Sequence, residues 1–372
     1  MRKLFYLFPI TIILLFAFCE QRQGSPRIKI ENGIPVVYNS IEPEPIPGKP
    51  SKMILEEELS VGVEEGQEEY MFSFIPALDV DEEGRMYVVD AKGAHIRVFD
   101  NSGKYLQTIG RKGKGPGEML MPWSIHITPQ KEIMVLDSMN YNLQFFSLKG
   151  DFLRSLKIPM GMVFTDPKVD SKGNIINIVK TYSSYNEKNE LIKYNFESED
   201  VALSTDNVIF SFSHPKIIYM NSPRFIWQLM KNDNIIWGYP EKYELNILNP
   251  KGKPIKKIIK EYKPARTTQK MKDSVSQIKK RRGLDIKVSE ETPAYRRIFV
   301  DDVDRILVLT WEKAKTEGKD FEVVDVFDPY GIYMTKIYLR TGIVVCKKNK
   351  LYTVEETKEG FSVVKRYNVI WK

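Results

Sequence analysis

The sequence predicts an all-β fold, a six-bladed β-propeller built from four-stranded antiparallel blades. Two segments, 78–109 and 125–156, repeat each other in register without a gap, so that Asp90 matches Asp137, 47 positions later. A repeat of about 40 to 50 residues made of short strands is typical of a propeller blade, which cannot bury its own faces alone. The composition agrees, because 12% of the 372 residues are aromatic and the predicted strands are rich in Val, Ile, Tyr and Phe, which suit a pleated, half-buried surface.

The chain begins with a predicted export signal. Arg2 and Lys3 precede an apolar run over 4–18, the pattern of the charged and hydrophobic regions of a secretory signal peptide. The run contains Pro9 and is short for a membrane span of about 20 residues. We therefore assign 1–18 to a signal peptide and expect the mature protein to be exported.

Cys19 follows the apolar run directly and resembles the lipidated cysteine of a bacterial lipoprotein, although Phe18 stands where that signal normally has Gly, Ala or Ser. The alternative is an ordinary signal peptide cut after Cys19. Both alternatives place the mature protein outside the cytoplasm, and the first anchors it to a membrane of the cell envelope, facing the periplasm or the cell exterior. Cys346 lies in an apolar run and is expected to be a small buried side chain.

The segment 19–51 is rich in Pro, Gly and Glu. Repeated prolines favour an extended, polyproline-like backbone and exclude regular sheet pairing. We expect this segment to be a lipid-anchored tether that holds the folded domain away from a membrane. The propeller then occupies 52–372.

The first blade shows four short alternating runs separated by turn residues, which predict four antiparallel strands. These runs are 77–80, 85–90, 95–100 and 104–109. Looser copies of the pattern follow along the chain. They place blades two to six at about 124–156, 166–203, 225–252, 297–331 and 342–369.

The last predicted blade lacks one strand. It has runs at 342–346, 350–355 and 361–369, and the sequence then ends. An otherwise unassigned strand at 52–61 can supply the fourth. Pairing the first and last strands closes the ring and removes an exposed seam. Six blades with this closure are the prediction, and seven blades are the alternative.

An insertion at about 266–283, between blades four and five, breaks the strand pattern. Met271, Val275 and Ile278 recur at helical spacing and Gly283 is a natural stop, which predicts a short amphipathic helix. A helix packed on the propeller with a solvated basic face is the expectation. Contact of that face with anionic lipid or an acidic partner is the alternative. The basic residues are Lys270, Lys272, Lys279, Lys280, Arg281 and Arg282.

The segments 79–90 and 96–106 resemble NHL repeats. The chain is also similar to the bacterial six-bladed β-propeller lipoproteins, whose first blade commonly leads into a loop like 109–118. This resemblance implies the propeller fold and an extracytoplasmic location. It implies no particular reaction.

In a propeller, the connections between blades and the loops between second and third strands share the top face, where the central channel opens. Function usually resides in such loops, because the sheets are scaffold. We therefore predict ligand-binding residues on this face. They are Asp90, His95, Arg111, Lys112, Lys114, Trp123, Asp137, Asn140, Arg296 and Trp311.

The loop 111–118 alternates Gly113, Gly115 and Gly117 with lysines, so backbone N–H groups and cations there could bind a phosphate or carboxylate. The loop lacks the strand, helix and Gly-Lys-Ser/Thr ending of a nucleotide P-loop. The expected alternative is a blade linker that needs glycine for tight turns.

Repeated and aromatic residues leave two further alternatives. Asp90 and Asp137 either cap loop N–H groups, which is the expectation, or form a paired carboxylate site. Trp123 and Trp311 either stack on a sugar or peptide ring or pack in the core.

We expect no catalytic residue, no cofactor and no bound metal. His95, His126 and His214 occupy non-equivalent blade positions without metal-ligand spacing, and no nucleophile motif such as Gly-x-Ser-x-Gly occurs. The formal charge of +7 is spread over many residues, whereas a nucleic-acid footprint is clustered, so we do not expect nucleic-acid binding.

The sequence therefore predicts a non-enzymatic, extracytoplasmic binding or scaffold module, a monomer whose top face meets a protein, peptide or glycan. The alternative is a metal-dependent hydrolase or lyase with its site at the mouth of the central channel. That alternative requires Asp90, Asp137, His126 and Glu355 to converge. A third hypothesis is assembly of an envelope complex through the basic helix.

Overall fold

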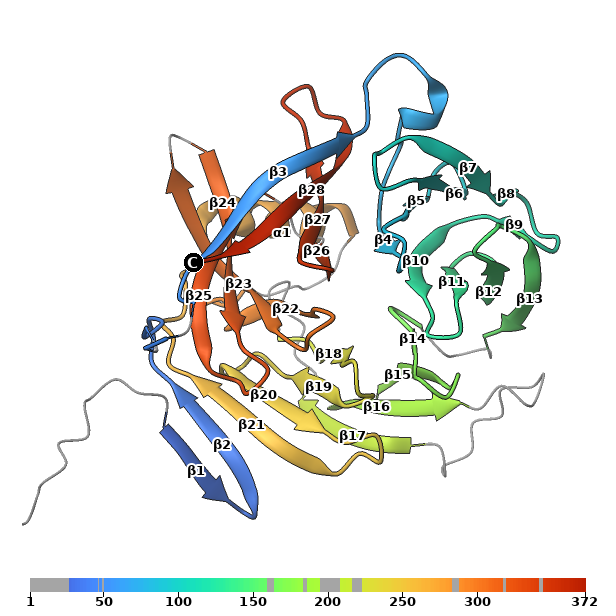
Figure 1. Cartoon of the computed structure of the whole chain (residues 1–372). Helices are drawn as coiled ribbons and strands as arrows, with labels where there is room; N and C mark the ends of the chain where they lie inside the picture. Colours follow the sequence, from blue (N-terminus) through green and yellow to red (C-terminus); the bar gives the residue numbers. More distant parts are fainter. Residues whose placement is uncertain are drawn as a thin grey trace, which may run out of the picture.

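The computed structural model describes residues 27–372, apart from 46, 49, 159–163, 183–185, 195–207, 216–222, 283–287, 317–318 and 341–343. Six sheets, each with four antiparallel blade strands, surround a central opening (Figure 1). Each sheet contributes its first strand to the channel wall and its last strand to the rim. The predicted six-bladed propeller is confirmed.

The first three blades follow one another along the chain without exchange of strands. Blade 1 consists of β4 (Leu78–Val80), β5 (Met86–Asp90), β6 (His95–Phe99) and β7 (Tyr105–Ile109). Blade 2 consists of β10 (Pro122–Ile127), β11 (Glu132–Asp137), β12 (Asn142–Ser147) and β13 (Phe152–Lys157). Blade 3 consists of β14 (Lys168–Val169), β15 (Ile175–Tyr182), β16 (Asn186–Tyr194) and β17 (Val208–Pro215).

Blades 4 and 5 are separated by the predicted helix. Blade 4 has β18 (Ile226–Leu229), β19 (Ile235–Gly238), β20 (Glu244–Leu248) and β21 (Pro254–Lys260), and blade 5 has β22 (Tyr295–Val300), β23 (Ile306–Thr316), β24 (Lys319–Phe327) and β25 (Tyr333–Leu339). The helix α1 (Gln269–Arg282) lies in the connection between them and buries Val275. Among the described residues, no helix is long and apolar enough to cross a membrane.

Blade 6 is completed by a strand from the other end of the chain. It contains β26 (Val344–Lys347), β27 (Lys350–Glu356) and β28 (Ser362–Trp371). The upstream strand β3 (Met53–Val61) pairs antiparallel with β28 from Trp371↔Met53 to Val364↔Val61. The predicted closure of the ring is therefore confirmed.

In the part of the chain that the structure describes, the hydrophobic core comprises six clusters, and each fills the space between two adjacent blades. Strand β5 shows how the sequence produces this. Tyr87 and Val89 on one face pack against blade 2, whereas Met86 and Val88 on the other face pack against blade 6. Because successive side chains of a strand point to opposite faces, a strand that is apolar throughout is buried on both sides.

The expectation that the tether excludes sheet pairing is wrong for residues 27–39. Strands β1 (Arg27–Glu31) and β2 (Ile34–Asn39) form a hairpin, and β2 pairs in parallel with β21, which extends blade 4 to six strands. The physical reason is the position of the prolines, most of which follow β2 at 43–50. Val36 and Val37 are almost completely buried.

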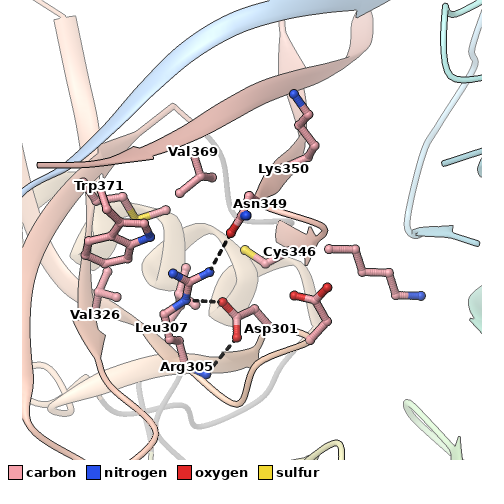
Figure 2. Close-up of a pocket in the computed structure, with 12 residues that line it drawn as sticks. Asp301, Arg305, Leu307, Val326, Cys346, Asn349, Lys350, Val369 and Trp371 are labelled. Atoms are coloured by element: carbon pink, nitrogen blue, oxygen red, sulfur yellow. Dashed lines mark hydrogen bonds and ion pairs between the residues drawn. The ribbon is translucent and has the colours of Figure 1, made fainter. Parts of the chain in front are cut away.

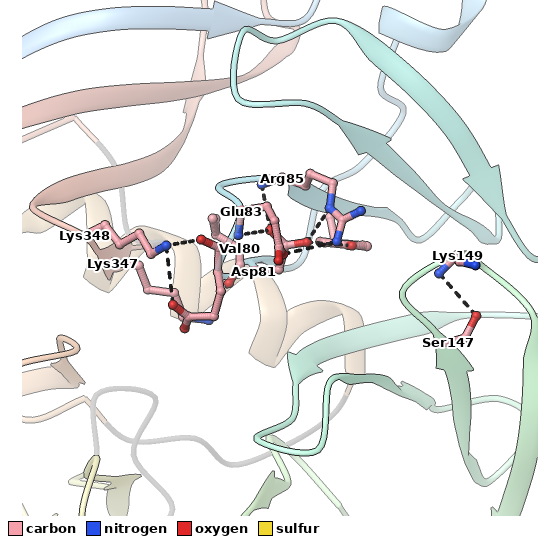
Figure 3. Close-up of polar contacts among 10 residues, drawn as sticks. Val80, Asp81, Glu83, Arg85, Ser147, Lys149, Lys347 and Lys348 are labelled. Atoms are coloured by element: carbon pink, nitrogen blue, oxygen red, sulfur yellow. Dashed lines mark hydrogen bonds and ion pairs between the residues drawn. The ribbon is translucent and has the colours of Figure 1, made fainter.

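The two hairpin turns on the bottom face of a blade share one hydrogen-bonding device. In the first turn of blade 1, Asp81 accepts from the backbone N–H groups of Glu83 (3.0 Å) and Arg85 (2.9 Å), and Gly84 has a φ of +81° that favours glycine (Figure 3). The same arrangement recurs in other turns, where a side-chain oxygen accepts from the backbone N–H groups two and four residues later in the chain. It is held by Asp100, Ser147, Asp170, Asn249, Asp301 and Asp328.

Hydrogen bonds at the inner end of the blades join every blade to the next. Most come from the turns between the first and second strands. Around the ring, they join Ile127 N to Asp79 (2.8 Å), Gln130 to the carbonyl of Ser171 (3.1 Å), Ser171 N to Asp233 (2.9 Å), Lys231 N to Asp304 (2.8 Å), Lys348 N to Asp302 (2.9 Å), and the Lys348 ammonium to the carbonyl of Glu82. The bottom of the propeller is thus a continuous circuit.

A buried charged network joins blades 4 and 5 nearer the rim. Lys260 Nζ lies 3.4 Å from Asp325 Oδ2, with both side chains 1% exposed. The hydroxyls of Tyr243 and Tyr333 donate to the same carboxylate at 2.7 and 2.6 Å, and the Lys260 ammonium lies over both rings. Asn39 of β2 accepts from Tyr333 N at 2.8 Å, so the hairpin is bound to blade 5 as well.

Deletion of residues 52–61 tests the closure. Removing β3 exposes the apolar side of blade 6 and opens an edge, which we expect to cost about 4 kcal/mol or more, or about 10 °C in melting temperature. The measurement is a calorimetric melt. Deletion of 27–39, which leaves all six blades four-stranded, serves as the comparison, and an equal or smaller loss on deleting β3 would contradict its closing role.

Substitution of Lys260 tests the buried network. Lys260→Met leaves the carboxylate of Asp325 without its buried cation, so we expect the free energy of unfolding to fall by about 3–5 kcal/mol in denaturant titration. The control is Lys257→Met on the same strand, whose pair with Glu244 is partly exposed. That variant should lose no more than about 1 kcal/mol. Similar losses in both variants would refute the assignment.

Candidate functional site

The central channel is a cavity of about 870 Å³ lined by the inner strands of all six blades. Strands β4, β10, β14, β18, β22 and β26 surround it in Figure 1. Each of these strands runs from the top face to the hydrogen-bonded turns of the bottom face. Residues at their starts therefore line the mouth, and residues near their ends line the deep part.

Polar side chains meet in the deep part of the channel at equivalent positions of neighbouring blades. Asp79 in blade 1, His126 in blade 2 and Lys168 in blade 3 each lie two residues before the bottom turn. The Nδ1 atom of His126 is 3.5 Å from Asp79 Oδ2. Lys347 of blade 6 donates to Asp79 Oδ1 at 2.9 Å and to the carbonyl of Val80 (Figure 3). The contacts of Asp79 link three consecutive blades, 6, 1 and 2, whereas Lys168 pairs with Asp166 at 2.9 Å.

The charges in this group are fixed by their surroundings. Burial raises the pKa of Asp79, but the Lys347 ammonium, the His126 hydrogen bond and the Ile127 N–H outweigh it and hold that pKa far below its usual range. Burial lowers the pKa of His126, and the nearby Lys168 lowers it further. Near pH 7 the imidazole is therefore neutral, with its proton on Nδ1, the nitrogen that faces Asp79.

The other imidazole nitrogen of His126 does not face an open site. Its Nε2 atom is covered from solvent and has no hydrogen-bond partner among the described residues. A general base must reach the proton that it abstracts. In this arrangement, the Asp79–His126 pair holds the channel wall together and does not offer a base to the channel.

The repeated aspartates of the top face bind backbone N–H groups of the connections beside them. Asp90 accepts from Ser73 N at 2.8 Å and from Gly93 N at 3.1 Å. Asp137 accepts from Leu120 N and Met121 N, both at 2.9 Å, and from Asn140 at 2.7 Å. The structure gives both aspartates a capping role.

His95 is turned into its own loop. Its Nδ1 atom lies 2.9 Å from the carbonyl of Gly93, and its Nε2 atom is covered and has no hydrogen-bond partner within the described ranges. Burial lowers the pKa of His95, and Arg97 lowers it further.

The glycine-rich loop carries its own anion. Strands β8 (Arg111–Lys112) and β9 (Glu118–Met119) pair in parallel and fold the loop. The Glu118 carboxylate accepts from Gly115 N at 3.0 Å and pairs with Arg111 at 3.0 Å, and these contacts lower its pKa. It thus occupies the cradle proposed for an external phosphate. Lys112 and Lys114 remain exposed beside it.

Several exposed apolar side chains lie in the top connections of blades 1 and 2. The rings of Phe74 and Trp123, which are 39% and 45% exposed, lie 5.9 Å apart. Other exposed side chains come from the connection into blade 1 and from the loop 138–141 of blade 2. We call the whole set the top patch; it comprises Val63, Met71, Phe74, Trp123, Met139 and Tyr141.

Arg296 and Trp311 lie apart from this patch, in blade 5. The Arg296 guanidinium stacks 5.1 Å from the Trp311 ring, donates to the Thr310 carbonyl at 2.9 Å and pairs with Glu322. The predicted residues therefore form two groups. Asp90, His95, Arg111, Lys112, Lys114, Trp123, Asp137 and Asn140 lie on blades 1 and 2, and Arg296 and Trp311 lie on blade 5.

The four residues that a channel-mouth enzyme would require do not meet. Asp90 and Asp137 cap different connections, and His126 faces Asp79. Glu355 instead accepts from Tyr367 within blade 6. No group of three or more His, Cys, Asp or Glu side chains in the described ranges is placed to hold a metal ion.

The sequence patterns did not predict the Asp79–His126 pair: the three histidines do occupy non-equivalent blade positions, but the partner of His126 is an aspartate at the equivalent position of blade 1. The two residues are 47 positions apart, which is the offset of the repeat itself. The repeat alignment therefore contained the signal. It is not visible as a conserved residue because the two copies hold different residue types that bind each other.

A second cavity lies between blades 5 and 6 and is too small for a ligand. Its volume is about 10 Å³, close to the minimum for one water. Figure 2 shows Arg305 bound to Asp301 and Asn349 in its wall, and the guanidinium also lies 5.1 Å from the Trp371 ring. Cys346 lines it too, and burial raises the pKa of its thiol.

Comparisons with known proteins agree with the architecture. A family model described as 6-bladed beta-propeller, DUF5128, matches residues 65–289. A Bacteroides fragilis protein that is described as exported has a similar structure, with a TM-score of 0.55, 11% identity, and coverage of 91% of this chain and 99% of that one. A member of the DUF4221 family from Bacteroides vulgatus has a TM-score of 0.50 and 12% identity, and the match covers 87% of this chain and 100% of that one.

A curated relative matches over a short segment. The E3 ubiquitin-protein ligase TRIM32 of Mus musculus is 40% identical over 53 residues, which are 14% of this chain. The match spans 8% of the length of that relative.

The two shifted histidines predict a stability that falls in mild acid. The pKa values of His126 and His95 are lowered in the folded state, so the unfolded chain binds more protons below about pH 6.5. The free energy of unfolding should be highest above that pH and fall as the pH decreases, by about 1.4 kcal/mol for each unit by which a folded pKa lies below the unfolded one.

Denaturant titrations between pH 7.5 and pH 5 measure this dependence. His126→Gln should flatten the curve in part, and His126→Gln with His95→Gln should flatten it further. An unchanged slope in the double variant would show that neither imidazole is responsible.

Proposed function

The chain belongs to the 6-bladed beta-propeller family DUF5128, and on that premise we propose that it is an extracytoplasmic binding module whose top face docks a protein or peptide. The observation that carries this proposal is the top patch, with its exposed tryptophan, phenylalanine, tyrosine and methionines. Aromatic residues, Met and Arg are enriched at protein interfaces, and exposed apolar groups on a stable scaffold are typical of recognition sites.

Exposed basic side chains surround the top patch and form a polar rim around it. Lys92, Lys112 and Lys114 are exposed on the same face, and the side chain of Arg111 is 82% exposed. Such cations contribute to orientation and association rate more than to affinity. Trp123 and Phe74 are the proposed anchors, because buried aromatic contacts dominate binding energy at most interfaces.

The positions of the acidic residues and histidine that an enzyme would use favour binding over catalysis. The carboxylates and histidine that a hydrolase or lyase would use are bound to separate partners, and His126 Nε2 is covered. A glycan remains an alternative occupant, since Trp123 could stack on a sugar ring.

We further propose that the 1–18 signal exports the protein, that Cys19 anchors it to a membrane of the cell envelope, and that it acts as a monomer. The support is the charged and apolar pattern of the N-terminus and the resemblance to bacterial propeller lipoproteins with NHL-like repeats. These residues lie outside the described part of the chain. Cys19-dependent incorporation of labelled palmitate is the direct check.

Site-specific photocrosslinking in cells tests the docking face. We expect a crosslinking amino acid at Trp123 or Tyr141 to capture one discrete partner. The matched controls are Tyr330, 66% exposed in a bottom turn, and Tyr338, 53% exposed on β25. Their products should lack that partner.

Binding by purified proteins then measures the contribution of the anchor. Trp123→Ala should weaken the recovered complex by about 2 kcal/mol, close to 30-fold, with an unchanged melting temperature. Equal capture at Tyr330 and Tyr338 would refute a site at the top patch. Products that disappear after glycosidase treatment would assign the face to a glycan.

A further inference from the structure

The folded domain begins much closer to Cys19 than the predicted tether allows. Fully extended, residues 19–51 could separate Cys19 from the propeller by up to about 120 Å. However, β1 begins at Arg27, so only the eight residues 19–26 lie between Cys19 and the first described strand. Eight residues span at most about 29 Å, whatever their conformation.

The β1–β2 hairpin is fixed to the rim of the propeller. Strand β2 pairs in parallel with β21 of blade 4, and the carbonyl of Asn39 accepts from Glu261 N at 3.0 Å. The side-chain amide of Asn39 donates to the carbonyl of Gly331 at 3.0 Å and accepts from Tyr333 N at 2.8 Å, both in blade 5. The hairpin therefore cannot move away from blades 4 and 5 without breaking these contacts.

The chain that follows the hairpin also stays on the body of the protein. Glu42 pairs with Lys336 of β25 at 3.1 Å. Lys52 N donates at 3.0 Å to the carbonyl of Lys372, at the end of blade 6. The described part of the predicted tether is thus folded against blades 4, 5 and 6, and the spacer to Cys19 is reduced to residues 19–26.

Strand β1 forms the outer edge of the six-stranded sheet, and all five of its residues are exposed. Ile28 and Ile30 share one face, because alternate residues of a strand point the same way, and they are 58% and 70% exposed. Ile30 is more exposed than any other large apolar side chain in the described ranges. Proteins usually protect an open sheet edge with charges, prolines or bulges, whereas this face of β1 carries two isoleucines. The edge is therefore suited to an apolar contact.

We propose that the β1–β2 hairpin is the membrane-proximal part of the protein and that Ile28 and Ile30 contact lipid. Lipid contact at this strand rests on the Cys19 anchor proposed above. An anchor within about 29 Å keeps β1 near the bilayer, and apolar side chains gain free energy when they leave water for the interface. The edge backbone needs hydrogen bonds, so it stays among the hydrated headgroups while the isoleucine side chains reach the acyl boundary.

This attachment orients the ring relative to the membrane. Blades 4 and 5 lie across the ring from blades 1 and 2 (Figure 1). A propeller that meets the bilayer with the rim of blades 4 and 5 directs blades 1 and 2, with the top patch, away from the lipid. The docking face then stays accessible to a protein or peptide, which a long flexible tether would not ensure.

Photocrosslinking on vesicles tests the lipid contact. The chain from Cys19 to Lys372 is coupled through Cys19 to a maleimide lipid in vesicles of phosphatidylethanolamine and phosphatidylglycerol. Burial raises the pKa of the Cys346 thiol, so that thiol reacts slowly. A benzophenone amino acid replaces Ile28 or Ile30, and mass spectrometry measures lipid adducts after irradiation. We expect yields at least about fivefold above those at matched control positions, because only the strand at the interface meets lipid.

The controls are Leu106 on β7 and Leu153 on β13, which are 47% and 44% exposed on the outermost strands of blades 1 and 2. Equal or absent lipid yields at all four positions would overturn the membrane contact. Adducts between two protein chains at Ile28 or Ile30 would overturn it as well and assign the edge to a second copy. Because the coupling is chemical, these outcomes do not depend on acylation in cells, whereas failed palmitate incorporation would contradict the Cys19 anchor itself.

Discussion

Each blade of this protein has two apolar faces that only the neighbouring blades can cover, and the rest of the structure depends on that constraint. The six hydrophobic clusters formed by the described residues all lie between blades. A blade with one uncovered face would expose its core, so the ring must close. Closure by β3 completes blade 6, and Val61 of that strand packs in the same cluster as Leu78 of blade 1.

Closure also separates the two faces of the molecule by function. The bottom turns are short, many share one hydrogen-bonding arrangement, and hydrogen bonds join each to the next blade, so a change in one turn affects its neighbour. The top connections are longer and differ from blade to blade, with a parallel strand pair in one and a helix in another. Variation is tolerated where the ring does not depend on it, which is where recognition residues accumulate. The exposed aromatic and methionine side chains of blades 1 and 2 follow this division.

Much of the fold was predictable because the repeat imposes one pattern on the chain. The 47-residue offset identified strands, turns and the incomplete last blade, and the unpaired strand at 52–61 followed from counting. The β1–β2 hairpin could not be found this way. Its partner, β21, lies about 220 residues away in sequence, and parallel addition to a blade edge leaves no local signal. Asn39 shows why it docks there, since its amide bonds both Ile259 and Tyr333.

The candidate site was harder to predict because its key contacts join unlike residues from repeated positions. Asp90 and Asp137 were recognisable since both copies kept the same residue and the same capping task. Asp79 and His126 occupy equivalent positions but are complementary, so a search for identity overlooks them. The same complementarity holds at the base of the channel, where the carboxylates of Asp233 and Asp302 accept from backbone N–H groups of the adjacent turns.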